Sequence, residues 1–202
     1  MNTITIIGQT VGVFAAAVMI FSFQFRDNKK LFAAQVCSTF LFTIHYLLLG
    51  LGGDSGAYAG MAQNFGGVLF RILLVLAEKN KKFKHPLALT VICAYAAVTS
   101  AVTFDPSNVI GLLPMVGNMV GMGALWSGDP NVIRVEQFSF TSPCWLIYNI
   151  FTGSIAGIFT ESFNIISIAV YYIRALIRKK KTEKEERGTP DEESENNGNR
   201  QL

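Results

Sequence analysis

Charged residues are scarce over most of this chain. Only 15% of its 202 residues are charged, whereas 50% are hydrophobic. The charges are grouped, and the intervals between the groups are apolar runs of about the length that crosses a bilayer. A soluble domain of this size would carry charged residues along every element. The pattern therefore excludes an ordinary soluble domain and indicates a membrane protein with several spans.

Cysteine is also rare. Each of the three cysteines, Cys37, Cys93 and Cys144, falls within a predicted span. Their spacing matches neither a disulfide framework nor a metal site, so we expect thiols that pack as small hydrophobes, and no cofactor or metal. The first residues lack the positive leader and the small-residue cleavage pattern of a signal peptide. We therefore expect them to remain as the first span.

The residues of a catalytic site are missing too. A Ser/His/Asp arrangement would need an acid at the depth of His45, and we place Asp54, Asp105 and Glu161 in outer turns. The glycine-rich LGLGGDSG lacks the Lys-Ser/Thr ending of a phosphate-binding loop. The basic loops are explained by membrane topology and do not indicate nucleic-acid binding. We therefore expect no enzymatic activity.

What the sequence does contain is a series of apolar runs of spanning length. A spanning helix needs roughly 20 mainly apolar residues, with a range of about 17–25. The sixth run is the weakest, because Gly153 and Gly157 loosen it and its boundary with the seventh is short. The sequence thus predicts an all-α integral membrane protein with seven transmembrane helices, over residues 4–24, 31–50, 57–77, 86–104, 109–126, 142–159 and 161–177.

The positive charges in the loops predict the orientation. If the N-terminus faces outside, every loop lysine and arginine is cytoplasmic, and the charged residues of the outer loops are all acidic. Cytoplasmic loops carry this excess of Lys and Arg, so we expect the inner (plasma) membrane, an external N-terminus and a cytoplasmic C-terminus. Residues 178–202 carry seven positive and seven negative charges and a single aliphatic side chain. We expect a disordered charged tail there.

Two segments of the chain follow one plan. Residues 25–50 and 128–153 each contain a polar inner loop, then a span, then a pair of polar or aromatic residues shortly before a glycine. The two pairs are His45-Tyr46, before Gly50, and Tyr148-Asn149, before Gly153.

The third span of each half carries an asparagine at the same depth. Asn64 and Asn164 each lie 14 residues before the charged residue at which their span ends. At ~1.5 Å per residue, both amides lie about 21 Å from the cytoplasmic edge of a ~30 Å core. We therefore predict two parallel repeats of three helices, over residues 1–77 and 109–177, joined by a linker helix over residues 86–104.

These features resemble a known group of transporters. The NFGG motif that begins at Asn64, the aromatic-to-glycine end of the second span and the 3+1+3 layout resemble the SWEET sugar transporters and the wider PQ-loop group. In that group an asparagine from the third helix of each half faces the substrate cavity, which implies this role for Asn64 and Asn164. The segment FQFRDNKK stands where the PQ motif would lie, with Gln24 in the glutamine's place. The Pro-Gln dipeptide itself is absent, and Pro114 is the only proline well inside a predicted span.

A more specific resemblance covers residues 1–177. FQFRDNKKLFAAQ and SPCWLIYNIFTGSIAGIFTE are similar to the bacterial inner-membrane YgjV family. This resemblance implies a location and a layout rather than a particular activity.

Polar and aromatic residues at membrane depth form the predicted site. We expect Asn64 and Asn164 to bind a solute, or else to make hydrogen bonds between helices. His45 is interpreted as a donor in helix packing or as part of a proton relay. Other side chains that would line such a cavity, unless they only pack, are Tyr46, Tyr148, Asn149, Trp145 and Asn118.

Two arginines lie within predicted spans. Arg71 and Arg174 can snorkel, which keeps the apolar stem in the membrane and the charged head at the interface. The functional alternative is a gate or an anion contact at the cytoplasmic mouth. Gln24 and Pro114 are further candidates for a gate or interface position.

We interpret the chain as a facilitative carrier of a small, neutral, sugar-like solute. The alternative is a non-transporting membrane scaffold or receptor-like protein built on the same bundle. A carrier predicts a continuous polar cavity between the halves near Asn64 and Asn164. A scaffold predicts amides bonded to neighbouring helices around an apolar centre. The expected partners are the lipid bilayer and such a solute, with homo-oligomers left open and nucleic acid excluded.

Overall fold

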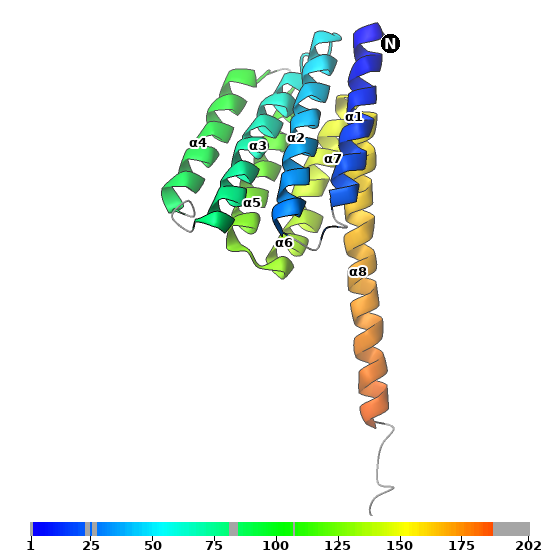
Figure 1. Ribbon diagram of the computed structural model, residues 1–202. Helices are drawn as coiled ribbons and strands as arrows, with labels where there is room; N and C mark the ends of the chain where they lie inside the picture. The colour runs from blue at the N-terminus through cyan, green and yellow to red at the C-terminus, as the bar shows by residue number, and fades with distance from the viewer. Residues whose placement is uncertain (1, 23–24, 26–27, 81–84, 107, 188–202) are drawn as a thin grey trace, which may run out of the picture. The chain divides into compact units, whose positions relative to one another are not determined.

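The chain is helical almost throughout the residues that its computed structural model describes, which are 2–22, 25, 28–80, 85–106 and 108–187 (Figure 1). Six helices in this part of the chain are long and apolar enough to cross a membrane. An all-α membrane protein is thus confirmed. The elements are α1 (Thr3–Ser22), α2 (Asn28–Leu51), α3 (Ala57–Lys79), α4 (Pro86–Thr103), η2 (Val109–Leu112), α5 (Leu113–Ser127), α6 (Pro130–Glu136), the π-helical η3 (Gln137–Thr141), α7 (Ser142–Phe151) and α8 (Ile155–Arg187).

The first five predicted spans are confirmed as helices, with bounds that differ by a few residues. The predicted linker, 86–104, is α4, whose first turn contains Pro86 and is capped by the side chain of His85. Proline suits the first turn because its missing N–H is not needed there. Pro114 likewise lies in the first turn of α5, after the 3₁₀ turn η2. It therefore starts a helix and does not interrupt one.

The sixth predicted span, 142–159, is wrong. The chain is already helical from Pro130, where the side chain of Asp129 caps the first free N–H groups, and it stays helical to Phe151. α6, η3 and α7 follow one another without a gap, over roughly the 20 residues that a span needs. The polar residues before position 142 suggested a loop, but Glu136 is only 8% exposed because the helix turns it inward.

The turns after α2 and α7 share a hydrogen-bond pattern and a glycine with positive φ. Gly53 and Gly153 both have positive φ, 111° and 60°, which glycine adopts without steric cost. Equivalent positions lie one hundred residues apart, the spacing that also separates Asn64 from Asn164. Two backbone hydrogen bonds close each turn, and they match between the turns. In the first turn, the Asp54 N–H donates to the Leu49 carbonyl and the Gly53 N–H donates to the Gly50 carbonyl. In the second, the Ser154 N–H donates to the Asn149 carbonyl and the Gly153 N–H donates to the Ile150 carbonyl.

This spacing corrects the comparison of the two halves. The sequence comparison aligned Gly50 with Gly153, whereas the backbone aligns Gly53 with Gly153. The pairs His45-Tyr46 and Tyr148-Asn149 are therefore not at equivalent positions, since the difference of three residues is almost one helical turn.

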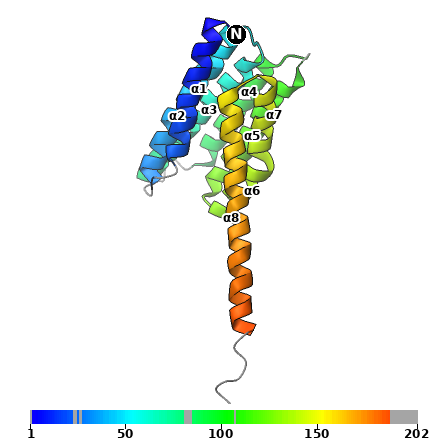
Figure 2. The same cartoon turned by 90° about the vertical axis from the view of Figure 1, so that its right-hand side faces the viewer.

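Residues 1–165 form one compact unit. Within it α1 packs against α2, α2 against α3, and α3 against α4, while α5 contacts α4 and α7. Figure 2 shows α1 and α2 on one side of this unit and α5, α6 and α7 on the other. The main core draws on α1, α2, α3, α7 and the start of α8, through Ala15, Ala16, Phe42, Tyr46, Leu49, Ala57, Ala59, Trp145, Tyr148 and Ala156.

Residues 166–202 form a second unit, of which the structure describes α8 as far as Arg187. The tail that the sequence predicts to be disordered from residue 178 therefore starts as helix. Lys, Arg and Glu are good helix formers even when they cannot form a core, which explains why a charged segment continues the helix. Residues 188–202 lie outside the described residues.

Candidate functional site

An aromatic cluster joins α2 to α7. The ring centroids of Tyr46, Trp145 and Tyr148 lie 5.8–6.0 Å apart, in the tilted and edge-on arrangements that aromatic pairs prefer. The Tyr46 hydroxyl donates a hydrogen bond to Oδ1 of Asn149 at 2.5 Å. None of these four side chains is more than 7% exposed. The structure thus brings four of the predicted residues together, in a packed core.

The Tyr148 hydroxyl is inserted into the first turn of α3. It accepts a hydrogen bond from the Gly60 N–H at 2.7 Å and donates one to the Gly56 carbonyl at 2.8 Å. In an uninterrupted α-helix that N–H would bond directly to that carbonyl, four residues earlier. Only glycine fits at position 60, because a Cβ there would lie 2.6 Å from the hydroxyl oxygen. Tyr148 therefore replaces a backbone hydrogen bond and ties α7 to α3.

His45 is fully buried and bonded at both ring nitrogens. Nδ1 lies 2.7 Å from the Gly8 carbonyl oxygen, and Nε2 lies 2.7 Å from Oγ of Ser154. Because a carbonyl only accepts, Nδ1 carries the proton, and Nε2 of a neutral ring then accepts from the serine hydroxyl. The histidine joins α1, α2 and the turn before α8. This geometry favours the packing interpretation of His45 over a proton relay.

A set of amides connects α3 to α4 and α5. Gln63 is 1% exposed, and its Nε2 donates to the Ala96 carbonyl at 3.0 Å. Asn118 Nδ2 donates to the Gln63 backbone carbonyl at 2.8 Å. Asn64 donates to the Gly60 carbonyl of its own helix at 2.9 Å. Each amide therefore bonds within its own helix or to a neighbouring one, as polar residues in helix packing do.

A polar cluster surrounds the π-helical segment η3. A π-helix brings residues five positions apart onto one face. Pro143 lies two residues after this segment, and because it has no N–H, the carbonyl four residues earlier, within the segment, lacks its α-helical partner. The α-helix is interrupted for this reason. Two side-chain hydrogen bonds have the π spacing, from Thr141 to Glu136 and from Gln137 to Ser142.

Glu161 lies at the centre of this polar cluster. Its Oε2 accepts hydrogen bonds from Oγ of Ser142 at 2.6 Å and from Nδ2 of Asn164 at 3.3 Å. Its carboxylate also interacts electrostatically with Arg71 and Glu136. Glu161 is half-buried in the second turn of α8, so its placement in an outer turn is wrong. The turn before α8 comes earlier in the chain than predicted, and a carboxylate therefore lies inside the bundle.

Arg71 turns away from the nearer end of α3. Its Nη1 donates to the Gly67 carbonyl at 3.3 Å, one turn toward the N-terminal end of the helix. Gly67 leaves room for the guanidinium, since a Cβ there would lie 3.0 Å from Nη1. The Arg71 Nε is buried and has no hydrogen-bond partner among the residues that the structure describes. The side chain of Arg71 therefore points away from the Lys79 end of the helix, which favours the gate or anion-contact interpretation over snorkelling toward that end.

The other predicted positions are more dispersed. Arg174 is exposed on the part of α8 that belongs to the second unit, and Gln24 lies outside the described residues. Pro114 is fully buried at the start of α5. Asn64 and Asn164 make their hydrogen bonds to different residues, so a site formed by the two amides together stays a prediction.

Sequence reasoning missed Glu136, Ser142 and Glu161 as members of the cluster. A signal was present in the Asp129-Pro130 dipeptide, an N-cap residue followed by a proline that starts a helix. Beginning the sixth helix there would have moved its end to the glycine-containing turn before α8. Glu161 would then have fallen within the last helix.

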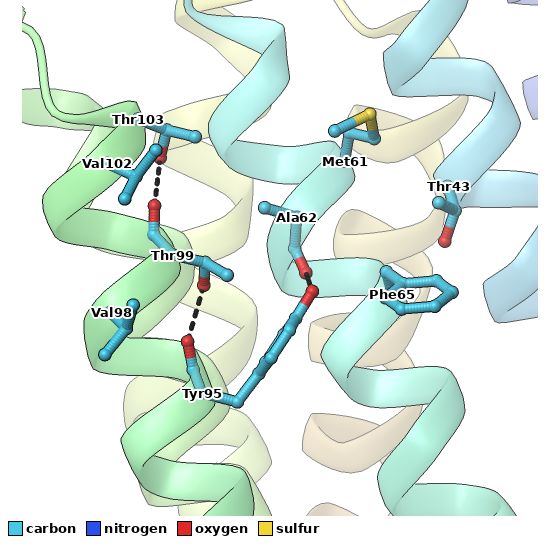
Figure 3. Close-up of a pocket in the computed structure, with 9 residues that line it drawn as sticks. All are labelled: Thr43, Met61, Ala62, Phe65, Tyr95, Val98, Thr99, Val102 and Thr103. Carbon is cyan, nitrogen blue, oxygen red and sulfur yellow. Dashed lines mark hydrogen bonds between the residues drawn. The ribbon is translucent and has the colours of Figure 1, made fainter.

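An apolar groove runs between α3 and α4, with one side chain from α2 (Figure 3). Its volume is about 400 Å³. The hydroxyls of Tyr95, Thr99 and Thr103 that line it donate to backbone carbonyls, so they offer little to a polar solute. The groove is not the predicted polar cavity between the halves, because its lining contains neither asparagine: it consists of Thr43, Met61, Ala62, Phe65, Tyr95, Val98, Thr99, Val102 and Thr103.

The comparison with known families agrees with this architecture. A family model described as a bacterial inner membrane protein, Imp-YgjV, matches residues 6–179. The chain belongs to this YgjV family. It is 26% identical over 156 residues to the inner membrane protein YgjV of Escherichia coli (strain K12), which covers 77% of this chain and 76% of that protein. No solved structure matches the chain. The chain is therefore a multi-pass protein of the bacterial inner membrane.

Proposed function

We propose that this YgjV-family protein is a facilitative carrier of a small polar solute, which binds at the cluster of Arg71, Ser142, Glu161 and Asn164. The supporting observation is Glu161, a half-buried carboxylate among helices of membrane-spanning hydropathy. Ionisable side chains inside a bilayer are costly and mark solute or ion pathways. If the bundle had only a structural role, apolar groups of similar size in place of these charged groups would make it equally stable or more stable.

The proposal includes a membrane topology. The chain crosses seven times, with α6, η3 and α7 as the sixth crossing, and the N-terminus is outside and the C-terminus cytoplasmic. The matched turns at Gly53 and Gly153 then lie on the same side, as two parallel three-helix repeats joined by α4 require. This arrangement is that of the SWEET and PQ-loop transporters. The protein moves its solute without changing it chemically, so it is not an enzyme.

A scaffold or receptor-like role is the second candidate. It is favoured by the aromatic cluster, where the Tyr46 hydroxyl is bonded to Asn149 and the Tyr148 hydroxyl to the backbone of Gly56 and Gly60, so that neither hydroxyl is free to bind a solute. In that case only the polar cluster around Glu161 would need another explanation.

Uptake into proteoliposomes decides between the two roles. The purified chain is reconstituted, and radiolabelled sugars, polyols, amides and amino acids are tested for uptake above that of protein-free vesicles. A carrier gives saturable uptake of at least one solute, which Glu161→Ala lowers at least tenfold. Uptake equal to that of empty vesicles for the whole panel, or uptake unaffected by Glu161→Ala, would contradict the proposal.

A further inference from the structure

One N–H group of the Arg71 guanidinium lacks an acceptor among the described residues. A guanidinium offers five N–H donors, and the hydrogen bond from Nη1 to the Gly67 carbonyl is long, at 3.3 Å. The Nε–H is buried and has no partner in the described part of the chain. Burying a charged donor without an acceptor is destabilising, and a ligand oxygen at this position would remove that penalty. Since guanidinium matches a carboxylate in bidentate geometry, the missing group is best supplied by an acidic oxygen pair.

The carboxylates of Glu161 and Glu136 accept hydrogen bonds from groups other than Arg71. Glu161 interacts electrostatically with Arg71, but its Oε2 is bonded to Ser142 and Asn164. Glu136, which also interacts with Glu161, is bonded to Thr141. Glu161 on α8 thus interacts electrostatically with the cation on α3 and with the carboxylate of Glu136 on α6, while both carboxylates accept hydrogen bonds from groups other than Arg71. Arg71 is the positive pole and the two carboxylates are the negative pole.

We propose that these two poles bind a small zwitterion, with its acidic group on Arg71 and its ammonium group on the carboxylates of Glu161 and Glu136. The transport role of this site rests on the proposed function, but binding itself does not. A zwitterion satisfies both poles together, so no desolvated charge stays unpaired. A simple anion would meet two carboxylates, a simple cation would meet the guanidinium, and a neutral sugar would leave both poles without a counter-charge.

Matched ligands test the charge requirement on the purified full chain. Thermal shift is measured with the twenty common α-amino acids, and for each zwitterion that binds, with its two fragments: the carboxylate without the amine and the amine without the carboxylate. Glucose is the neutral control. At least one zwitterion raises the melting temperature in a saturable way, while its fragments and glucose bind at least tenfold more weakly. A fragment or glucose that binds as tightly, or no binding by any zwitterion, overturns the inference.

Four variants test the assignment of the poles. Arg71→Gln and Glu161→Gln each weaken zwitterion binding at least tenfold, and Arg71→Lys gives an intermediate loss because it keeps the charge but not the planar fork. Arg178→Gln and Asp105→Asn, which each remove one charge from a residue that is not a member of the cluster, leave the affinity unchanged. Size-exclusion chromatography and circular dichroism confirm that each variant is folded. Equal loss in the cluster variants and the controls overturns the assignment.

Uptake measurements separate this inference from the proposed function. Zwitterion binding that depends on Arg71 and Glu161, but without uptake into proteoliposomes, supports the binding site and contradicts the carrier. Uptake of a neutral solute that Arg71→Gln leaves unchanged but Glu161→Ala lowers contradicts the zwitterion site and supports a carrier whose solute does not contact Arg71.

Discussion

The hydroxyl of Tyr148 accepts a hydrogen bond from the N–H of Gly60, in a place where the helix would otherwise bond to itself. The neighbouring Tyr46 hydroxyl instead donates to a side-chain oxygen, that of Asn149. The two tyrosines are both almost fully buried, but because their partners differ, removal of each hydroxyl has a different consequence. The difference depends on whether the groups bonded to each hydroxyl can form another hydrogen bond after the hydroxyl is removed.

Tyr46→Phe is expected to cost more stability than Tyr148→Phe. Loss of the Tyr46 hydroxyl leaves the buried oxygen of Asn149 without its donor, which costs about 1–3 kcal/mol. Loss of the Tyr148 hydroxyl allows the Gly60 N–H to bond the Gly56 carbonyl as in an ordinary helix, so the cost is below ~1 kcal/mol. Equilibrium unfolding in detergent measures both variants. An equal or larger loss for Tyr148→Phe would show that α3 cannot close this bond.

Gly60→Ala is expected to destabilise the bundle, whereas Gly123→Ala is not. A Cβ at position 60 would lie 2.6 Å from the Tyr148 hydroxyl oxygen, but one at position 123 meets nothing within 4 Å. In the open position, alanine gains up to about 1 kcal/mol from helix propensity. In the crowded position this gain is outweighed by displacement of the tyrosine. Melting temperatures of the two variants give the comparison, and a higher melting temperature for Gly60→Ala would refute the inserted hydroxyl.

Asp54 predicts a pH dependence of stability. Burial raises the pKa of Asp54, in the turn between α2 and α3, above its ordinary value of 3.8, partly offset by hydrogen bonds from the Gly56 and Ala57 N–H groups. The folded state therefore holds this proton more tightly than the unfolded chain does. Its contribution to stability is largest below the unfolded pKa and falls as the pH rises through the folded one.

Asp54→Asn should remove this part of the pH dependence, because the amide does not titrate in this range and its oxygen can still accept from the Gly56 N–H. Melting temperatures of the two proteins are compared between about pH 4 and pH 8. As the pH rises, the melting temperature of the variant should increase relative to that of the original protein. A constant gap over the whole range would contradict the raised pKa.

Single cysteines test the proposed sixth crossing. In a chain whose three cysteines are replaced by serine, Asp54→Cys and Ile155→Cys should react with a membrane-impermeant maleimide added to intact cells, whereas Asn131→Cys should react only after lysis. The reason is that α6, η3 and α7 separate residue 131 from the exposed residue 155 by one spanning length. Labelling of Asn131→Cys and Ile155→Cys from the same side would exclude a crossing between them.

The sequence predicts helices well where local signals agree. The limits of α4 follow from the charged loop before it and from Pro86, which fits a first turn. For α6 and α7 the signals disagree: Glu136 and Gln137 are polar, yet their side chains are satisfied within the bundle by groups five positions away. Hydropathy records polarity but not the partner, so the sixth helix began twelve residues too late.

The members of the site were harder to predict than its presence. Tyr46 and Asn149 belong to pairs that the two halves suggested independently, but only packing shows that the pairs contact each other. The direction of Arg71 depends on Gly67, whose lack of a side chain gives the guanidinium space beside its own helix. Whether an arginine side chain points to the membrane interface or to the interior of the bundle thus depends on its neighbours, which the arginine itself does not reveal.

The contacts between the two halves have one further consequence. Tyr46 with Asn149, His45 with Ser154 and Tyr148 with Gly60 each join a residue before α4 to one after it. The covalent connection is therefore only one of several links between the halves. If the gene is divided between α4 and η2 and the two fragments are expressed together, they should associate in the membrane and co-purify. Each fragment supplies hydrogen-bonding groups that the other would otherwise leave without partners.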